Sequence, residues 1–154
     1  MNKPIILIVD DNPLDIFLLK RQLAKIGIDN DVRAVHDGQE VYAYLQGQDF
    51  FVEREQYPYP ALILLDINMP TSGFDVLGFL RSHPRHRHIP VIALTGDSDP
   101  SYVTKAYRLG ARAFLTKPVE PGSLLSMLNG VANLKTTENE LVVDEMSSSA
   151  LTAA

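Results

Sequence analysis

The amino-acid sequence predicts an α/β domain built on a parallel β-sheet. The first supporting observation is a set of nearly unbroken apolar runs at residues 5–9, 62–65, 91–94 and 113–115. Such runs are typical of parallel strands, which are buried on both faces. The second observation is that these runs alternate with stretches of helical periodicity, as repeated βαβ units would. With 154 residues, 45% of them hydrophobic, the chain is long enough to bury the core of one domain.

The first helix is the best marked of the predicted elements. Asn12 is a favoured N-cap residue, Pro13 suits the first helical position, and Asp15 places negative charge in the first turn. Gly27 is the expected end of this helix. Its buried side is predicted from apolar residues at helical spacing, namely Ile16, Leu19, Leu23 and Ile26.

The remaining elements continue the same alternation. Consecutive strands joined by a helix are expected to run parallel, with right-handed crossovers. We expect residues 1–134 to form the folded domain, and residues 135–154 to form a polar tail that is disordered or loosely docked. The sequence predicts further strands at 32–35, 62–66, 91–95 and 113–115, and further helices at 39–45, 74–82, 100–109 and 121–133.

Two connecting segments carry unusual side chains. The connection at 46–60 is long and holds four aromatic residues, for which packing within the loop is the favoured interpretation. The segment 83–88 holds three histidines, and its arginines would repel a metal cation, so a solvated loop is predicted there. The isolated His36 is expected to be structural. The aromatic residues are Phe50, Phe51, Tyr57 and Tyr59, and the three histidines are His83, His86 and His88.

Composition excludes several classes of function. The net charge of −5 argues against nucleic acid as a direct partner, because phosphate binding needs a basic surface. No apolar run approaches the roughly 20 residues that span a bilayer, and no secretory signal precedes Asp10. The absence of cysteine excludes disulfides and thiolate chemistry. The sequence therefore predicts a cytoplasmic protein that has no membrane partner.

Polar residues that suit phosphoryl chemistry follow the predicted strands. Asp10 and Asp11 end the first apolar run, and Asp66 ends the third strand. Thr95 ends the fourth strand, and Lys117 follows the fifth. Because ligands of open α/β sheets bind beyond the carboxyl ends of the strands, these five side chains are expected to gather at one sheet edge.

Such a cluster would bind a divalent cation, and one of its carboxylates would remain able to act as a nucleophile. Asp11 and Asp66 offer oxygen ligands that suit Mg²⁺, and Asp10 would bind through water or tune the site. The backbone carbonyl of Asn68, two residues beyond Asp66, would add a further ligand. A carboxylate in this position can attack phosphorus and form an acyl phosphate.

The obstacle to that reaction is charge, since clustered carboxylates repel an incoming phosphoryl group. Mg²⁺ would cancel part of the negative charge, and Lys117 would approach the phosphoryl oxygens as a point cation. The Thr95 hydroxyl would donate a hydrogen bond to another phosphoryl oxygen. Phosphoryl transfer needs little beyond this positioning and neutralisation.

Four ordered sequence blocks resemble the signatures of the response-regulator receiver domain. Together they span roughly residues 4–133, and their order along the chain makes the resemblance specific. It implies a doubly wound, five-stranded parallel sheet with five helices, in the flavodoxin-like order. The blocks are residues 8–12, 65–70 with Gly73, 93–96, and 110–118.

The resemblance also implies a role for each matching position. Asp66 corresponds to the phosphoacceptor, which takes a phosphoryl group from a phosphohistidine on a sensor kinase. The bond between Lys117 and Pro118 resembles a cis peptide of the family. The other matching positions are Asp10 and Asp11 as the acidic pair, Thr95 as the switch hydroxyl, Lys117 as the catalytic lysine, and Phe114 as the aromatic that turns inward on activation.

The long segment before the third strand resembles the single-domain regulators that pair with cyanobacterial phytochromes and bacteriophytochromes. The expected partner is therefore a sensor histidine kinase of the phytochrome type, or a histidine phosphotransfer protein. A homodimer is also considered, because the fourth helix offers apolar residues for an outer patch. These residues are Tyr102, Val103, Ala106 and Tyr107.

Alternative functions remain open at this point. An aspartyl-phosphate phosphatase that uses Mg²⁺ would carry a second aspartate as general acid where this chain has Asn68. A flavin-binding module would place phosphate beside Asp10 and Asp11, which would repel it. A receiver-like module that binds partners without phosphorylation would have lost acidic or lysine positions that are present here. The expected chemistry is self-catalysed phosphotransfer and autodephosphorylation, without turnover of a separate substrate.

Overall fold

A five-stranded parallel sheet forms the centre of the protein. The computed structural model describes residues 4–96 and 99–130. The strand order is β2-β1-β3-β4-β5, and every neighbouring pair is parallel, so the predicted flavodoxin-like order is confirmed. The strands are β1 (Ile5–Val9), β2 (Asp31–Val35), β3 (Pro60–Asp66), β4 (Val91–Thr95) and β5 (Ala113–Thr116).

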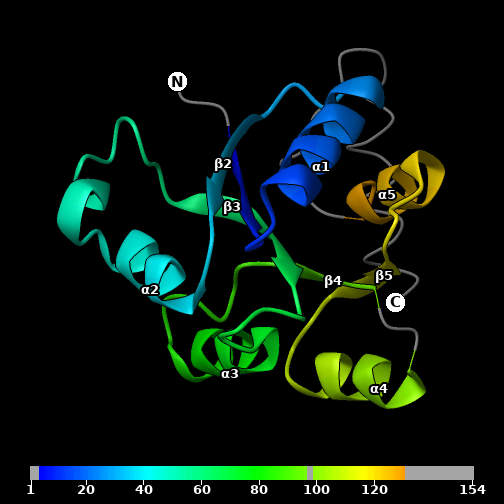
Figure 1. The fold of residues 1–154 in the computed structure, drawn as a ribbon. Coiled ribbons are helices and arrows are strands. Elements are labelled where there is room, and N and C mark those ends of the chain that lie inside the picture. The colour runs from blue at the N-terminus through cyan, green and yellow to red at the C-terminus, as the bar shows by residue number, and fades with distance from the viewer. Residues whose placement is uncertain (1–3, 97–98, 131–154) are drawn as a thin grey trace.

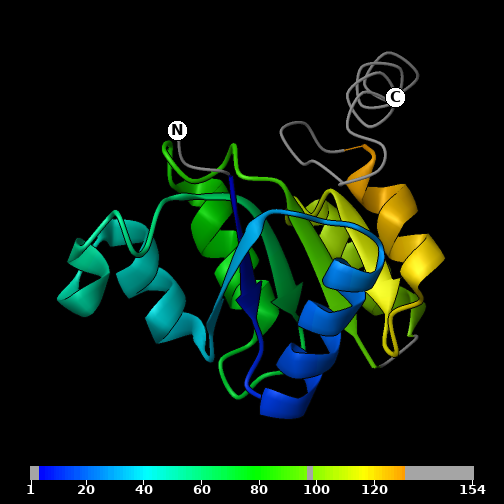
Figure 2. The same cartoon turned by 90° about the horizontal axis from the view of Figure 1, so that it is seen from above.

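Helices cover both faces of this sheet (Figure 1 and Figure 2). The first and last helices, α1 (Pro13–Lys25) and α5 (Pro121–Leu128), lie together on one face. The other face is covered by α2 (Gly38–Gln46), α3 (Gly73–Ser82) and α4 (Pro100–Arg108). Within the described residues, no helix is both long enough and apolar enough to cross a membrane.

The apolar strand runs serve two separate cores. Ile6 and Ile8 of β1 belong to the core beneath α1 and α5, whereas Leu7 and Val9 belong to the core beneath α2, α3 and α4. Successive side chains of a strand point to opposite faces, so a strand covered on both sides must be apolar at every position. All five residues of β1 are accordingly buried.

Most predicted boundaries hold to within one or two residues. The Asn12 side chain accepts hydrogen bonds from the backbone N–H groups of Leu14 and Asp15, which confirms the predicted N-cap of α1. The last helix is shorter than predicted, because it ends at Leu128 with Asn129 as its C-cap. The rest of the predicted 121–133 helix beyond residue 130, and the predicted tail at 135–154, lie outside the described residues.

The connection between α2 and β3 packs on itself, as predicted. It contains a short 3₁₀ helix, η1 (Asp49–Val52), and the ring of Phe51 is buried against Tyr44 and Tyr57. The Arg54 guanidinium donates hydrogen bonds to the carbonyls of Tyr44, Leu45 and Tyr57, which ties the loop to the end of α2. Phe50 departs from this pattern, since 69% of it is exposed.

The prediction of a solvated histidine loop at 83–88 is wrong for His86. This residue is only 2% exposed, and its ring stacks on His83 with 4.0 Å between ring centroids. Its Nδ1 atom also contacts the hydroxyl of Tyr59, and Phe79 of α3 lies beside it. Burial, aided by His83 and Arg85, lowers the pKa of His86 to about 4.

His36 has a local partner. Its ring Nδ1 lies 2.9 Å from the Glu40 carboxylate, which also accepts a hydrogen bond from the His36 backbone N–H. This bond links the end of β2 to the first turn of α2, which agrees with the structural role expected for His36.

Candidate functional site

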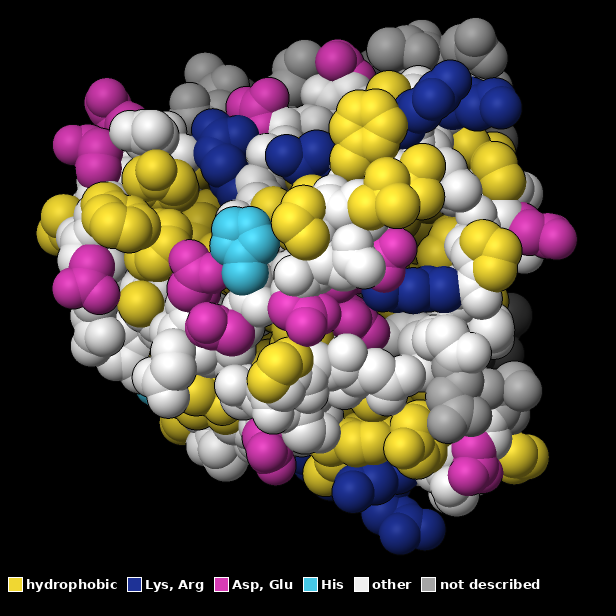
Figure 3. Space-filling model, viewed as in Figure 1, with side chains coloured by type: hydrophobic (Ala, Val, Ile, Leu, Met, Phe, Trp, Pro, Cys, Tyr) yellow, Lys and Arg dark blue, Asp and Glu magenta, His cyan; other side chains and the backbone are white. Residues whose placement is uncertain are grey.

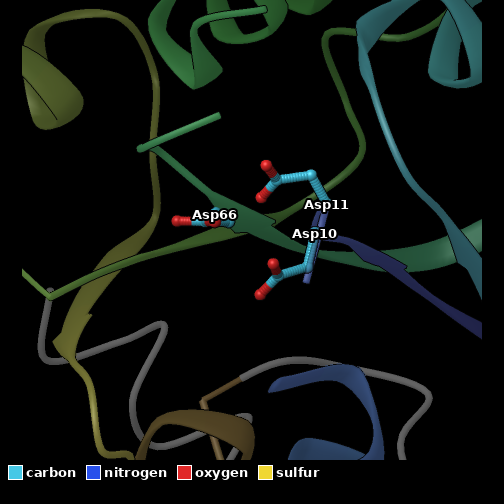
Figure 4. A group of neighbouring side chains, drawn as sticks. All are labelled: Asp10, Asp11 and Asp66. Atoms are coloured by element: carbon cyan, nitrogen blue, oxygen red, sulfur yellow. The ribbon is translucent and has the colours of Figure 1, made fainter. Parts of the chain in front are cut away.

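Three aspartates meet at the carboxyl ends of β1 and β3 (Figure 4). The two strands are neighbours, and Val9 pairs with Leu65, so the residues that follow each strand lie side by side. One carboxylate oxygen from each of Asp10, Asp11 and Asp66 lies within 4.8 Å of the others. Asp10 and Asp66 are buried, whereas Asp11 is exposed at the mouth of the site.

Asp66 is closely packed at the end of β3, with contacts from two sides. One carboxylate oxygen accepts a hydrogen bond from the Asn68 N–H at 3.0 Å, and the other lies 3.5 Å from the Lys117 ammonium. The start of α3 comes very close behind it. A Cβ atom at Gly73 would stand 2.6 Å from the Asp66 carbonyl oxygen, so only glycine fits there without a shift.

Lys117 is the cation of this site and contacts three carboxylates. Its Nζ atom lies 2.7 Å from Asp10, 2.9 Å from Asp15 and 3.5 Å from Asp66. The backbone of the lysine is tied to the end of β4, because its N–H donates to the Thr95 carbonyl at 2.7 Å. The peptide bond between Lys117 and Pro118 is cis. The cis peptide agrees with the expectation from the family resemblance.

The sequence does not predict the contact between Asp15 and Lys117. Local rules assign Asp15 only a favourable charge in the first turn of α1. One signal could have indicated its role, since α1 starts three residues after Asp10 and its first turn must therefore lie at the same sheet edge. Its carboxylate thus competes with Asp10 and Asp66 for one ammonium group.

Thr95 and Asn68 lie together on the side of the site toward β4. The Asn68 side-chain amide donates a hydrogen bond to the Thr95 hydroxyl at 2.8 Å, and Thr95 is fully buried. Phe114 lies on β5, is partly buried, and packs against the core beneath α2, α3 and α4. The structure therefore brings Thr95 and Asn68 to the aspartates, while Phe114 belongs to the adjoining core.

The electrostatics of the site reflect an excess of negative charge. Burial raises the pKa of Asp66 to about 6, with a further rise from Asp10 that Lys117 and the Asn68 N–H only partly oppose. Burial alone would lower the pKa of Lys117, but its hydrogen bonds to Asp10 and Asp15 raise it above the ordinary value. Four carboxylates thus lie around one ammonium group, which contacts three of them.

The residues present fit a divalent metal ion. Carboxylate oxygens are the ligands that Mg²⁺ and Mn²⁺ prefer. Two of the three clustered carboxylates are buried at this edge of the sheet. A cation of charge +2 would offset the charge that Lys117 leaves unbalanced. Because Asp11 is exposed, this side of the cluster is open to an ion from solvent.

Comparison with known proteins agrees with this arrangement. The profile of the "Response regulator receiver domain" family matches residues 6–129. The response regulator Rcp1 of Synechocystis is 34% identical over 128 residues, which are 82% of this chain and 85% of Rcp1. The crystal structure of the Mn²⁺-bound form of Rcp1 matches with a TM-score of 0.67 and 34% identity, over 80% of this chain and 88% of that one.

Two further structures are similar over most of their length. The response regulator RPA3017, described in red light signaling of R. palustris, has a TM-score of 0.77 and 34% identity, over 87% of this chain and 99% of that one. The bacteriophytochrome response regulator RtBRR has a TM-score of 0.75 and 32% identity, over 99% of this chain and 95% of that one. Because a family profile spans most of the chain and the fold and acidic edge agree with it, the protein belongs to the response regulator receiver domain family.

Proposed function

We propose that Asp66 accepts a phosphoryl group from a phosphohistidine, with Mg²⁺ as the resident ion, and that the modified domain changes its protein contacts. The observation that carries the proposal is the convergence of Asp10, Asp11, Asp66 and Lys117 at one sheet edge. This arrangement supplies a carboxylate nucleophile together with the means to neutralise phosphoryl charge.

The proposed step forms an acyl phosphate. A carboxylate oxygen of Asp66 attacks phosphorus, the bond between phosphorus and the donor's imidazole nitrogen breaks, and that nitrogen keeps the electron pair. Mg²⁺ bound by Asp10, Asp11, Asp66 and the Asn68 carbonyl would supply the positive charge that stabilises the transferring group. Hydrolysis by water attack on the same phosphorus would restore Asp66. Both reactions are carried out by the domain on itself, without a separate substrate.

Lys117 and Thr95 are assigned to opposite sides of the phosphoryl group. The Lys117 ammonium, 3.5 Å from Asp66, needs only to shift from Asp15 to reach a phosphoryl oxygen. The Thr95 hydroxyl, now bonded to Asn68, would donate to another phosphoryl oxygen, and Phe114 would follow it inward. These two residues therefore couple the chemistry to a change in the surface.

Relatives suggest the partner. RPA3017 and RtBRR are described with red light and bacteriophytochrome signalling, and the resemblance at 46–60 points the same way. We infer that the phosphoryl donor is a phytochrome-type histidine kinase or a histidine phosphotransfer protein in the cytoplasm. A homodimer through α4 would use Tyr107, which is 48% exposed. Residues 1–134 would carry these activities, and residues 135–154 would be dispensable for phosphorylation.

Intact-mass measurement after treatment with Mg²⁺ and acetyl phosphate tests the proposal. We expect one base-labile phosphoryl adduct on the wild type, none on Asp66→Asn, and an unchanged adduct on the matched control Asp75→Asn. Equal labelling of Asp66→Asn would refute the assignment of the phosphoacceptor. Failure of the wild type to label under any Mg²⁺ concentration would favour the phosphorylation-independent binding module instead.

The rate of p-nitrophenyl phosphate hydrolysis distinguishes a response regulator from a phosphatase. A response regulator should show only slow, single-site turnover, because Asn68 cannot act as the general acid. Sustained turnover abolished by Asp66→Asn would instead identify the protein as a phosphatase.

A further inference from the structure

The amino-terminal edge of the sheet, opposite the aspartates, holds a second candidate site. The helices α3 and α4 lie side by side (Figure 1). Their last turns and the segment that leads into β4 line an open pocket of about 440 Å³. Its volume is within the range of pockets that bind small organic ligands. The cavity is separate from the phosphorylation site, since it shares no lining residue with it.

The charge of this cavity is the reverse of the charge of the whole chain. Its lining includes Arg81 from α3, Arg87 and His88 from the connecting segment, and Arg108 from α4, with no aspartate or glutamate. The chain itself carries a net charge of −5. Within residues 4–96 and 99–130, none of these guanidinium groups forms an ion pair. Three unpaired guanidinium groups around one cavity repel one another, and an anion bound between them would relieve that repulsion.

Part of this positive charge is fixed in position. Arg81 donates a hydrogen bond from Nη1 to the backbone carbonyl of Arg108, which bridges the ends of α3 and α4. The chain then leaves α4 through Gly110, whose φ of +107° favours glycine. The bridge holds the guanidinium at the cavity wall with its other N–H groups available, so the site needs little reorganisation to bind.

The remaining lining suits an organic body attached to the anion. Leu77, Leu80 and Val91 are almost fully buried and form an apolar floor. Tyr107 lies at the rim and is 48% exposed, so its ring is available for stacking. Phosphate groups match the bidentate donors of arginine, and a planar base matches a tyrosine ring on an apolar floor.

We propose that this cavity binds a nucleotide, with its phosphates held by Arg81, Arg87 and Arg108 and its base held against Tyr107. The proposal does not depend on phosphorylation of Asp66. It gives the exposed Arg87 a use that neither the fold nor the phosphoryl chemistry requires.

Calorimetry of the full chain with ADP, in the presence of EDTA to keep metal-bound nucleotide away from the aspartates, tests the proposal. We expect saturable binding to one site, with adenosine and pyrophosphate each binding at least tenfold more weakly. Arg87→Gln and Arg108→Gln should each weaken ADP binding at least tenfold, whereas the matched control Arg21→Gln on α1 should leave it unchanged. Tyr107→Leu should weaken ADP binding and leave pyrophosphate binding unchanged.

Amide NMR locates the site independently of affinity. ADP should shift the resonance of Gly110 and leave that of Asp11 unchanged. Four outcomes would overturn the proposal: no saturable binding, equal effects of Arg87→Gln and Arg21→Gln, pyrophosphate as tight as ADP, or shifts confined to the aspartate site.

Discussion

Asp66 and His86 are two buried titratable side chains toward opposite edges of the sheet, since Asp66 ends β3 whereas His86 lies in the segment that leads into the parallel strand β4. Burial drives both toward the neutral form. It raises the pKa of Asp66 to about 6 and lowers the pKa of His86 to about 4. Their surroundings differ. His86 is enclosed by rings and a tyrosine hydroxyl, whereas Asp66 faces Asp10 and Asp11 across less than 4.8 Å. The packing around His86 stabilises the fold. The carboxylates around Asp66 repel one another, and a bound cation would relieve that repulsion.

His86→Ala is expected to have the largest effect on stability. It removes a buried ring from contacts with Tyr59, Phe79 and His83, so the free energy of unfolding should fall by about 2–4 kcal/mol at pH 8. Urea titration measures the loss, and His88→Ala, on an exposed neighbour, is the matched control. Equal, small effects of the two variants would show that His86 packs no better than a surface residue.

The same histidine should make stability depend on pH below neutrality. Because the pKa of His86 is depressed from 6.5 to about 4 in the folded state, its contribution is present above pH 6.5 and is lost as pH falls toward 4. In urea titrations between pH 7 and 4, the free energy of unfolding of the wild type should therefore fall relative to that of His86→Phe, which has no group to titrate at this position. A difference in free energy of unfolding that stays constant across this pH range would contradict the shifted pKa.

Lys117→Met should have the next largest effect, because it leaves the buried Asp10 and Asp66 without their cation. We expect a loss of about 2–3 kcal/mol at pH 8 in chelator, with part of the loss restored by millimolar Mg²⁺. Thermal melts with and without Mg²⁺ measure both quantities. Lys105→Met on α4 is the control, and a stability equal to that control would show that the ammonium does not offset the clustered charge.

Asp66→Asn should raise the free energy of unfolding at pH 8, whereas the preceding variants lower it. The folded-state pKa of Asp66 is raised from 3.8 to about 6, so its contribution is most favourable below pH 3.8 and is lost as pH rises through 6. The variant should therefore be more stable than the wild type by about 1–2 kcal/mol at pH 8 in chelator, with no gain near pH 4. Asp75→Asn should show no such gain. Urea titration at the two pH values decides the matter, and destabilisation at pH 8 would contradict the origin proposed for the pKa shift.

Asp15→Asn should have the smallest effect. Asp15 is partly exposed and shares Lys117 with two other carboxylates, so its loss should cost less than about 1 kcal/mol. The same variant should speed phosphorylation by acetyl phosphate, since Lys117 is then freer to reach the phosphoryl group. Asp75→Asn is a matched control because Asp75 also lies in a first helical turn but makes no contact with Lys117. Slower phosphorylation of Asp15→Asn would show that Asp15 positions Lys117 productively.

The sequence by itself determined the fold class and the aspartate cluster, because both are written in local patterns. Unbroken apolar runs indicated strands covered on both faces, and Asp10, Asp11 and Asp66 stand directly after such runs. Parallel strands end at a common edge, so position within a run is enough to bring these residues together. The cap at Asn12 is equally local, since its partners are two and three residues away.

Only the tertiary structure decided which distant groups share an environment. Lys117 pairs with Asp15 across 102 positions, and His86 is buried by Tyr59 from 27 positions away. Neither contact leaves a periodic signal, because each depends on how loops and helix ends approach one another in the folded structure. A histidine between two arginines is expected in solvent from its sequence neighbours, yet Tyr59, just before β3, and Phe79 of α3 pack against it. Burial, and with it the pKa of each titratable group, is a property of that assembled surrounding and not of the residue's neighbours in the sequence.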